Sequence, residues 1–177
     1  MGQIDVLVNN AGGPVFNAPL LDYRADGFQR IVELNLYSVV RFCQRVGGHM
    51  VGRRSGSVLN NTSVTTFKPS PTQTAYGAAK AGVLNLTQAL AQEWGPFGVR
   101  VNAFGPGWIK THINRKLLAA EETTAAAVAR VPLRRWGDAS EVLVVAAFLA
   151  SDASSYVTGA HISVDGGLSL AWPEMAL

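Results

Sequence analysis

The chain has 177 residues, of which 48% are hydrophobic and 15% are charged, and its formal net charge is +3. This length suits one domain of ordinary size, and the hydrophobic content is too high for a disordered chain. A single cysteine, Cys43, excludes an internal disulfide framework and a multi-cysteine metal site. We therefore expect one folded domain that spans residues 1–177.

Charge and hydropathy patterns exclude several kinds of partner. The basic residues form only short groups such as Arg53-Arg54 and Arg134-Arg135, which are too small to follow a nucleic-acid backbone. The longest apolar run, Val142–Ala150, is far shorter than the ~20 residues of a membrane-spanning helix. The amino terminus lacks the basic region of a signal peptide, so we expect a cytoplasmic protein. No metal site is expected, because the histidines are far apart in the sequence: His49, His112 and His161.

The predicted elements alternate between strands and helices. The first is a strand at Ile4–Val8, whose continuous apolar run is typical of a strand buried on both faces. Apolar residues at three- and four-residue steps then predict a helix over Asp22–Met50. The later elements are expected at Ser57–Asn61, Thr74–Trp94, Val99–Phe104, Glu121–Arg130, Ala139–Ala150 and His161–Val164. This order predicts an α/β fold with a parallel sheet, right-handed crossovers and helices on both faces.

Tyr76 and Lys80 form a candidate acid/base pair. They lie four residues apart near the start of the predicted helix Thr74–Trp94, so they share one helix face. A phenol with a pKa of about 10 is a poor base at neutral pH, but a neighbouring ammonium stabilises the phenolate and lowers that pKa. Such a pair could instead be an ordinary surface or packing pair.

Ser63 and Asn35 are two further candidates for a catalytic site. Ser63 follows the predicted strand Ser57–Asn61, at the sheet edge where ligands bind in open parallel sheets. Its hydroxyl could stabilise charge on a carbonyl oxygen, or it could cap a turn. Asn35 lies in the middle of a predicted helix, where a buried amide marks either a kink satisfied by water or a polar relay.

Together with three further motifs, these residues resemble the short-chain dehydrogenase/reductase family. The resemblance runs from about Gly2 to Gly167, and the motifs agree in order and interval: Asn9-Asn10-Ala11-Gly12, Asn35, Ser63, Tyr76-x-x-x-Lys80, Pro106-Gly107-Trp108-Ile109-Lys110-Thr111 and Asp165-Gly166-Gly167. It implies a doubly wound Rossmann-type sheet. It also implies an NAD(P)-dependent oxidoreductase that transfers a hydride between the nicotinamide of NAD or NADP and a small-molecule alcohol or ketone.

The resemblance also implies roles for individual residues. Tyr76 would be the acid/base for the substrate oxygen, and Lys80 would lower its pKa and hold the nicotinamide ribose. Ser63 would orient the carbonyl, and Asn35 would anchor a water that links Lys80 to solvent. Besides Tyr76 and Lys80, the implied cofactor contacts are Asn10, Ala11, Gly12, Pro106, Gly107, Ile109 and Thr111.

The chain departs from the family pattern at its amino terminus. The family's T-G-x-x-x-G-x-G turn, which cradles the pyrophosphate at a helix amino terminus, is not found in this sequence. We therefore expect an N-terminally truncated fold, the C-terminal catalytic portion of the family's domain, that opens at the strand the family places fourth. The run Ile4–Val8 would then be an open sheet edge, and the position that selects between NAD and NADP would be absent.

Two expectations follow for the protein as a whole. The leading one is an oxidoreductase, and the alternative is a non-catalytic remnant that acts as a binding or scaffold module. Members of the family commonly form dimers and tetramers. We therefore expect a homo-dimer or homo-tetramer that associates through the Thr74–Trp94 helix and the region after Asp152.

Overall fold

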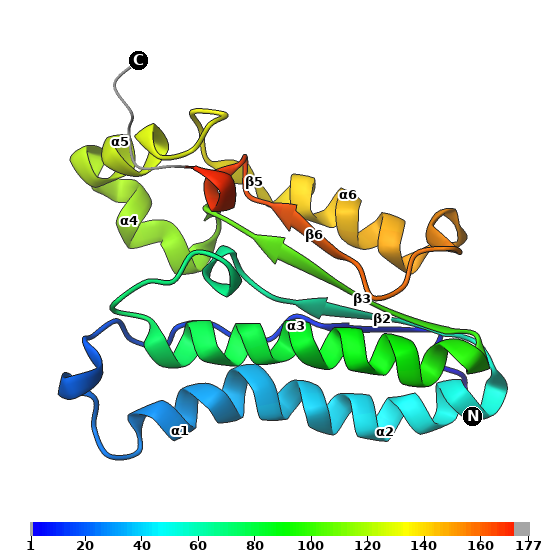
Figure 1. Ribbon diagram of the computed structural model, residues 1–177. Coiled ribbons are helices and arrows are strands. Elements are labelled where there is room, and N and C mark those ends of the chain that lie inside the picture. The colour runs from blue at the N-terminus through cyan, green and yellow to red at the C-terminus, as the bar shows by residue number, and fades with distance from the viewer. Residues whose placement is uncertain (1, 172–177) are drawn as a thin grey trace.

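Four parallel strands form one sheet, and helices lie on both of its faces (Figure 1). The computed structural model describes residues 2–171, without the side chains of Lys116, Glu122 and Thr123. The strand order is β1-β2-β3-β6, and every neighbouring pair is parallel. The expected α/β architecture is therefore confirmed. The strands are β1 (Val6–Asn9), β2 (Gly56–Asn61), β3 (Val99–Pro106) and β6 (His161–Val164).

One face of the sheet is covered by two long helices. The first consists of α1 (Gly27–Val32), a π-helical turn at Glu33–Tyr37 and α2 (Ser38–Arg53), and the second is α3 (Thr74–Trp94). The first helix thus begins later than the predicted Asp22, and it ends where Arg54 adopts a left-handed backbone conformation. The main core lies between these helices and the sheet and contains Val39, Cys43, Val46, Met50, Val58, Val83, Leu90, Ala91, Trp94, Val99 and Val101.

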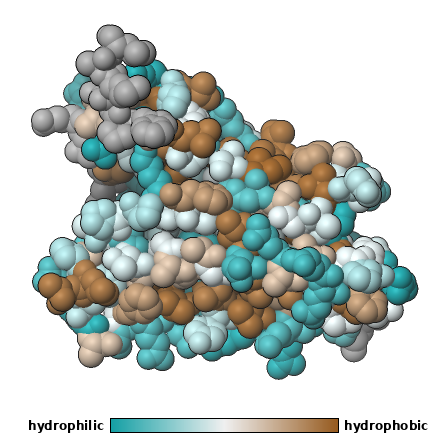
Figure 2. Space-filling model, in the orientation of Figure 1, coloured by the Kyte–Doolittle hydropathy of each residue, from teal (hydrophilic) through white to brown (hydrophobic). Residues whose placement is uncertain are grey.

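The opposite face is covered by the single helix α6 (Ala139–Ala150). A capping box formed by Asp138 and Glu141 begins this helix. The core between α6 and the sheet is smaller than the main core, with Leu59, Phe104 and Leu149 at its centre. The outer side of α6 is apolar as well, because Leu143 and Val144 are 67% and 69% exposed. Figure 2 shows hydrophobic surface, in brown, in the part of the molecule where Figure 1 has α6.

The edge strand β1 is covered on one face only. Leu7 packs against the main core, while Val6 and Val8 are 38% and 48% exposed. The cause is the position of α6, which contacts β2, β3 and β6. The prediction of a strand buried on both faces is therefore wrong, and β1 is an open edge of the sheet, paired with β2 alone among the described strands.

The last crossover of the sheet has the opposite hand to the first two. The sheet grows in one direction from β1 through β2 and β3 to β6. The first two connections pass over the face that α2 and α3 cover, whereas the third passes over the α6 face (Figure 1). Because the direction is the same and the face is opposite, the hand reverses. The prediction of right-handed crossovers throughout is wrong at this connection.

The segment between β3 and α6 lies at the carboxyl end of the sheet (Figure 1). It contains α4 (Arg115–Ala119) and α5 (Glu121–Ala129). It also contributes both strands of a second, two-stranded parallel sheet, β4 (Ile109–Lys110) and β5 (Gly137–Asp138). The sequence predicts the alanine-rich helix but not these strands, since two residues are too few to show a periodicity.

Candidate active site

The four candidate catalytic side chains come from three neighbouring parts of the fold. Ser63 directly follows β2 and caps a 3-10 turn at Val64–Thr66. Tyr76 and Lys80 lie in the first two turns of α3, which packs on that turn. Asn35 lies in the π-helical turn that joins α1 to α2 and contacts α3. The parallel sheet thus brings residues that are far apart in the sequence to the end of one strand.

Ser63 and Tyr76 are neighbours in the site, and the Ser63 hydroxyl acts on the pKa of Tyr76. The Ser63 hydroxyl is buried and also accepts a hydrogen bond from the Thr65 N–H at 3.2 Å, so it caps the turn as well. Burial raises the pKa of Tyr76, and the Ser63 hydroxyl lowers it in part. The pKa of Tyr76 is therefore raised rather than lowered as predicted, and Tyr76 is a neutral phenol at pH 7.

Lys80 is a buried amine next to the Tyr76 ring. Its Nζ lies 5.6 Å from the centre of that ring and donates a hydrogen bond to the carbonyl oxygen of Asn61 at 2.7 Å. Burial lowers the pKa of Lys80 to about 8. Its charge can therefore change near neutral pH, which an exposed lysine cannot do.

Asn35 is fully buried and holds the loop that follows β1. Its Nδ2 donates to the carbonyl oxygens of Ile31 and Gly13, and its Oδ1 accepts from the Gly13 N–H, each at 2.9 Å. Gly12 lies between Asn35 and Lys80: a Cβ atom there would be 2.5 Å from Asn35 Oδ1 and 3.5 Å from Lys80 Nζ. The Asn35 side chain thus lies in the π-helical turn and, through its hydrogen bonds to Gly13, fixes the loop after β1 next to the site.

The candidate cofactor contacts lie on two loops at the carboxyl ends of β1 and β3. Asn10 and Ala11 are exposed, and Asn61 Nδ2 donates to Asn10 Oδ1 at 2.6 Å. In the second loop Thr111 is exposed and Ile109 is buried in β4. These loops flank the end of β2, which Ser63 directly follows. Pro106, Gly107 and Gly12 are each half-buried there.

Glycines keep this surface open and bring its motifs together. A Cβ at Gly107 would lie 2.6 Å from the Cβ of Asp165, so the Pro106–Thr111 and Asp165–Gly167 motifs touch at this point. The missing Cβ of Gly12 leaves room beside Lys80. The exposed loops, the buried amine and the glycines fit the nicotinamide half of a dinucleotide, which requires close backbone approach.

A buried polar chain behind the site has no counterpart in the sequence predictions. Asn9 Nδ2 donates to Asn60 Oδ1 at 2.8 Å, and Asn60 Nδ2 donates to Thr87 Oγ1 at 2.9 Å. The Thr87 hydroxyl donates in turn to the Val83 carbonyl at 2.7 Å. These hydrogen bonds link β1 and β2 to α3. The sequence did contain a signal for this network: Asn60 lies in a strand predicted to be buried, and a buried amide needs hydrogen-bond partners. Asn60 is indeed fully buried.

A cavity of about 440 Å³ lies beside the second loop. Its walls include Trp108, Ile109, Leu133 and the Gly166-Gly167 backbone. Trp108 stacks on the buried ring of Trp136 at a centroid distance of 5.6 Å. The cavity therefore has a largely apolar wall next to a candidate cofactor-binding loop.

Within residues 2–171 the structure has neither a helix long and apolar enough to cross a membrane nor a group of three potential metal-ligating side chains. The parallel sheet, with its Ser63–Tyr76–Lys80 cluster at the carboxyl edge, defines the class of the protein as a Rossmann-type α/β protein with a polar site at the strand ends.

Comparisons with known proteins identify the family. A family profile described as "Enoyl-(Acyl carrier protein) reductase" matches residues 1–169. The 3-oxoacyl-[acyl-carrier-protein] reductase of Thermotoga maritima is 43% identical over 167 residues, which cover 94% of this chain and 67% of that protein. The gluconate 5-dehydrogenase of Gluconobacter oxydans is 37% identical over 171 residues, covering 97% and 66%. The chain belongs to the short-chain dehydrogenase/reductase family.

Solved structures agree with this assignment. A gluconate 5-dehydrogenase from Burkholderia cenocepacia, in complex with NADP and tartrate, superposes with a TM-score of 0.93 at 37% sequence identity. The match covers 97% of this chain and 67% of that one. The chain thus spans about two thirds of the length of the relatives that it matches.

Proposed function

We propose that the chain is the catalytic portion of an NAD(P)-dependent oxidoreductase acting on an alcohol/ketone pair. The observation that carries this proposal is the cluster of Ser63, Tyr76 and Lys80 at the end of β2. The NADP in the Burkholderia cenocepacia relative, and the NAD bound to a 3-oxoacyl-[acyl-carrier protein] reductase from Brucella melitensis, support NAD or NADP as the cofactor.

Each residue of the cluster has a separate task in carbonyl reduction. The neutral Tyr76 hydroxyl donates its proton to the substrate oxygen, and Ser63 donates a hydrogen bond that orients the same oxygen. Lys80, when protonated, stabilises the tyrosinate that remains after proton transfer. The nicotinamide, when bound, supplies the hydride for the carbonyl carbon. Asn35 keeps the Gly12-Gly13 turn in place beside Lys80.

The two loops next to this cluster are proposed to hold the cofactor. Lys80 and Tyr76 would face the nicotinamide ribose, and the exposed Thr111 hydroxyl is free to bind a polar cofactor group. The remaining contacts would come from Asn10, Ala11, Gly12, Pro106, Gly107 and Ile109. No residue here distinguishes NAD from NADP, so either cofactor fits the proposal.

We further propose that the protein works in the cytoplasm as a homo-dimer or homo-tetramer. The helix α3, through which we expect association, carries small residues that support this only in part, since Ala75 and Ala79 are buried within the chain and Gly82 packs near Leu36. The outer side of α6 offers an apolar surface with exposed Leu143 and Val144, and the first long helix exposes Tyr37 and Phe42. Covering the α6 surface would remove exposed aliphatic area from water.

The direct test restores a complete cofactor site. Gly2 of this chain is joined to the amino-terminal part of the Thermotoga maritima reductase, and the chimera is assayed for oxidation of NADPH and NADH with a probe ketone. We expect ketone-dependent oxidation. Tyr76→Phe should lower its rate by ~10²–10⁴ without loss of cofactor binding. Tyr156→Phe is the matched control, because Tyr156 is fully exposed.

Two outcomes would reject the proposal. An active chimera whose Tyr76→Phe variant works as fast as its parent removes the acid/base role of Tyr76. A folded chimera that binds the cofactor but oxidises it with none of a panel of ketones favours the alternative, a binding or scaffold module.

A further inference from the structure

One histidine contacts both ends of the segment that carries Ser63. His161 Nε2 lies 2.8 Å from Thr62 Oγ1, on the residue directly before Ser63. The same ring packs edge-to-face on Phe67, at a centroid distance of 4.9 Å, directly after the 3-10 turn that Ser63 caps. His161 belongs to β6, and Thr62 follows β2, so the contact joins parts of the chain that lie 99 positions apart.

The direction of the His161–Thr62 hydrogen bond can be deduced. Thr62 donates to the carbonyl oxygen of Phe104 twice, through its N–H at 2.9 Å and its hydroxyl at 3.0 Å. A hydroxyl has only one proton, so when that proton goes to Phe104 the Thr62 oxygen accepts towards His161. We assign the ring proton of His161 to Nε2 on this ground. Burial lowers the pKa of His161, although Asp165 opposes this, and the ring is neutral at pH 7.

This contact has to cross a strand, and the sequence of that strand permits it. In the sheet β3 lies between β2 and β6. The ring passes over β3 at Gly105, where a Cβ atom would lie 2.5 Å from His161 Nε2 and 3.0 Å from Thr62 Oγ1. Only glycine leaves room for a side chain of β6 to reach the end of β2 here.

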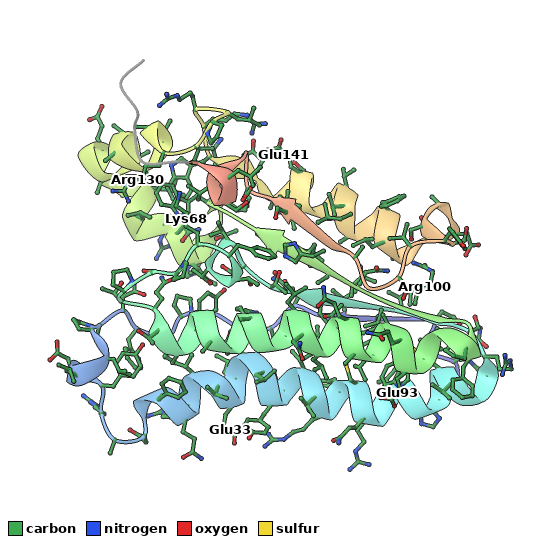
Figure 3. All side chains as sticks on the ribbon, in the orientation of Figure 1. Glu33, Lys68, Glu93, Arg100, Arg130 and Glu141 are labelled. Carbon is green, nitrogen blue, oxygen red and sulfur yellow. The ribbon has the colours of Figure 1, made fainter. Side chains whose placement is uncertain are left out.

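A second side chain holds the same segment from the other direction. Lys68 follows Phe67, and its Nζ donates to the carbonyl oxygens of Leu168 and Ala171 at 3.0 and 3.1 Å. Figure 3 shows Lys68 between the turn after β2 and the C-terminal 3-10 turn. The Ser63 segment is thus docked on residues of β3 and β6 and on the turn after β6 rather than being an independent loop.

We propose that His161 is a positioning residue, whose hydrogen bond to Thr62 and packing on Phe67 fix the turn that presents the Ser63 hydroxyl to Tyr76. The role of Ser63 towards substrate rests on the function proposed above, whereas the anchoring of the turn does not. A ring that merely filled space would be replaced equally well by any side chain of similar size, whereas an anchor requires the Nε2–H donor.

The anchoring is tested in the 177-residue chain without any substrate. His161→Leu keeps the volume and removes the donor, whereas His161→Gln keeps an N–H donor. Amide hydrogen exchange over residues 62–67 should be about tenfold faster in the leucine variant and within about threefold of the parent in the glutamine variant. Ser163→Ala is the control, because it lies two residues along the same strand. Equal exchange in the two His161 variants would overturn the proposal.

Two further measurements keep the proposal falsifiable if His161→Leu does not fold. Thr62→Val is isosteric and removes the acceptor, so it should reproduce the faster exchange. Nitrogen NMR of the parent should show the neutral ring of His161 protonated on Nε2; protonation on Nδ1 instead would contradict the deduced direction.

Turnover separates this proposal from the proposed function. In the chimera described above, His161→Leu should lower kcat by ~10-fold with little change in KM, and His161→Gln should restore most of it. An inactive parent chimera counts against the proposed function alone, because hydrogen exchange still decides the anchoring. An active parent with equal kcat in both His161 variants counts against the positioning role.

Discussion

The two faces of the sheet differ in how completely the chain covers them. On the face of α2 and α3, two long helices enclose a continuous core that includes Met50 and Val83, both fully buried. On the face of α6, one helix covers three of the four strands, Val6 and Val8 stay partly exposed, and α6 itself is apolar on its outer side. The first long helix exposes apolar side chains too, with Tyr37 at 49% and Phe42 at 57%, but the sheet beneath it is covered, whereas the second face leaves part of β1 open.

The candidate catalytic residues and the candidate cofactor contacts near β1 lie in parts of the fold that are covered to different extents. Asn35, Tyr76 and Lys80 all come from helices of the well-packed face, so their relative positions depend on the main core. Asn10 and Ala11, by contrast, follow the half-covered strand β1. The positions of the acid/base cluster thus depend on the main core of this chain, whereas the cofactor surface lies next to its open edge.

The largest expected difference between the faces concerns stability. Met50→Ala removes a fully buried side chain from the main core and should lower the free energy of unfolding by ~2–5 kcal/mol. Leu143→Ala, on the exposed side of α6, should change it by less than ~0.5 kcal/mol. Chemical denaturation of both variants measures this, and similar losses would show that the two faces are equally packed.

A smaller effect is expected from the polar chain within the packed face. Thr87→Val removes the partner of Asn60 Nδ2 and leaves a buried amide without its acceptor. The free energy of unfolding should fall by ~1–3 kcal/mol. Thr72→Val, at an exposed position, is the matched control in the same denaturation experiment. A loss no greater than that of the control would mean that the amide finds another partner.

The open face should also be the one that responds to a surface charge. If a second copy covers α6, Val144→Glu places a carboxylate in that contact and should weaken self-association about tenfold or more. The stability of the single chain should barely change, because Val144 is exposed. Analytical ultracentrifugation of parent and variant tests this, with Thr72→Glu as the control; equal association in all three would place the contact elsewhere.

The smallest expected effect is a pH dependence that comes from the packed face. Burial lowers the pKa of Lys80 from 10.5 to about 8, so between these values the unfolded chain binds the extra proton and stability rises with pH. From pH 8 to 9 the gain should be roughly 1 kcal/mol. Burial raises the pKa of Cys43 from 9.0 to about 11, which opposes this gain increasingly above pH 9.

That pH dependence can be isolated by two substitutions. A Cys43→Ala background removes the opposing thiol, and adding Lys80→Met should then flatten the stability profile between pH 8 and 9. Denaturation at half-unit steps of pH measures the slopes. A slope that persists after Lys80→Met would assign the effect to another group.

The elements predicted best are those whose ends are marked by helix-ending or helix-capping residues. The bounds of α3 and α6 agree with the prediction, since Gly95-Pro96 ends the one and Asp138 begins the other. The burial of β1 was misjudged because it depends on which strands α6 covers, a tertiary fact. The His161–Thr62 contact could not be read from the sequence, because it needs the strand order and the space left at Gly105.

The candidate site shows the same limit. The sequence put Ser63 at a strand end and Tyr76 and Lys80 on one helix face, and the structure has them in neighbouring elements; their roles came from the family resemblance and stay a prediction. The pKa of Tyr76 was predicted to fall and instead rises, since the sequence does not show how deeply the phenol is buried. The contacts of Asn35 with Gly13 likewise depend on the loop after β1 returning to the helix.

The π-helical turn around Asn35 has a consequence for the phase of the long helix. Six of its buried residues lie at every fourth position, at Gly27, Ile31, Asn35, Val39, Cys43 and Gly47, and Val46 and Met50 are buried as well. In a regular α-helix each four-residue step overshoots a full turn by about 40°, so five such steps would rotate the buried side by about 200° and carry it into solvent. The extra residue of a π-turn takes back about 100° of this rotation, and the remainder fits within one broad apolar face. The four-residue spacing of these buried residues is therefore explained by the π-turn. Because the helix is underwound there, Asn35 lies on its buried side.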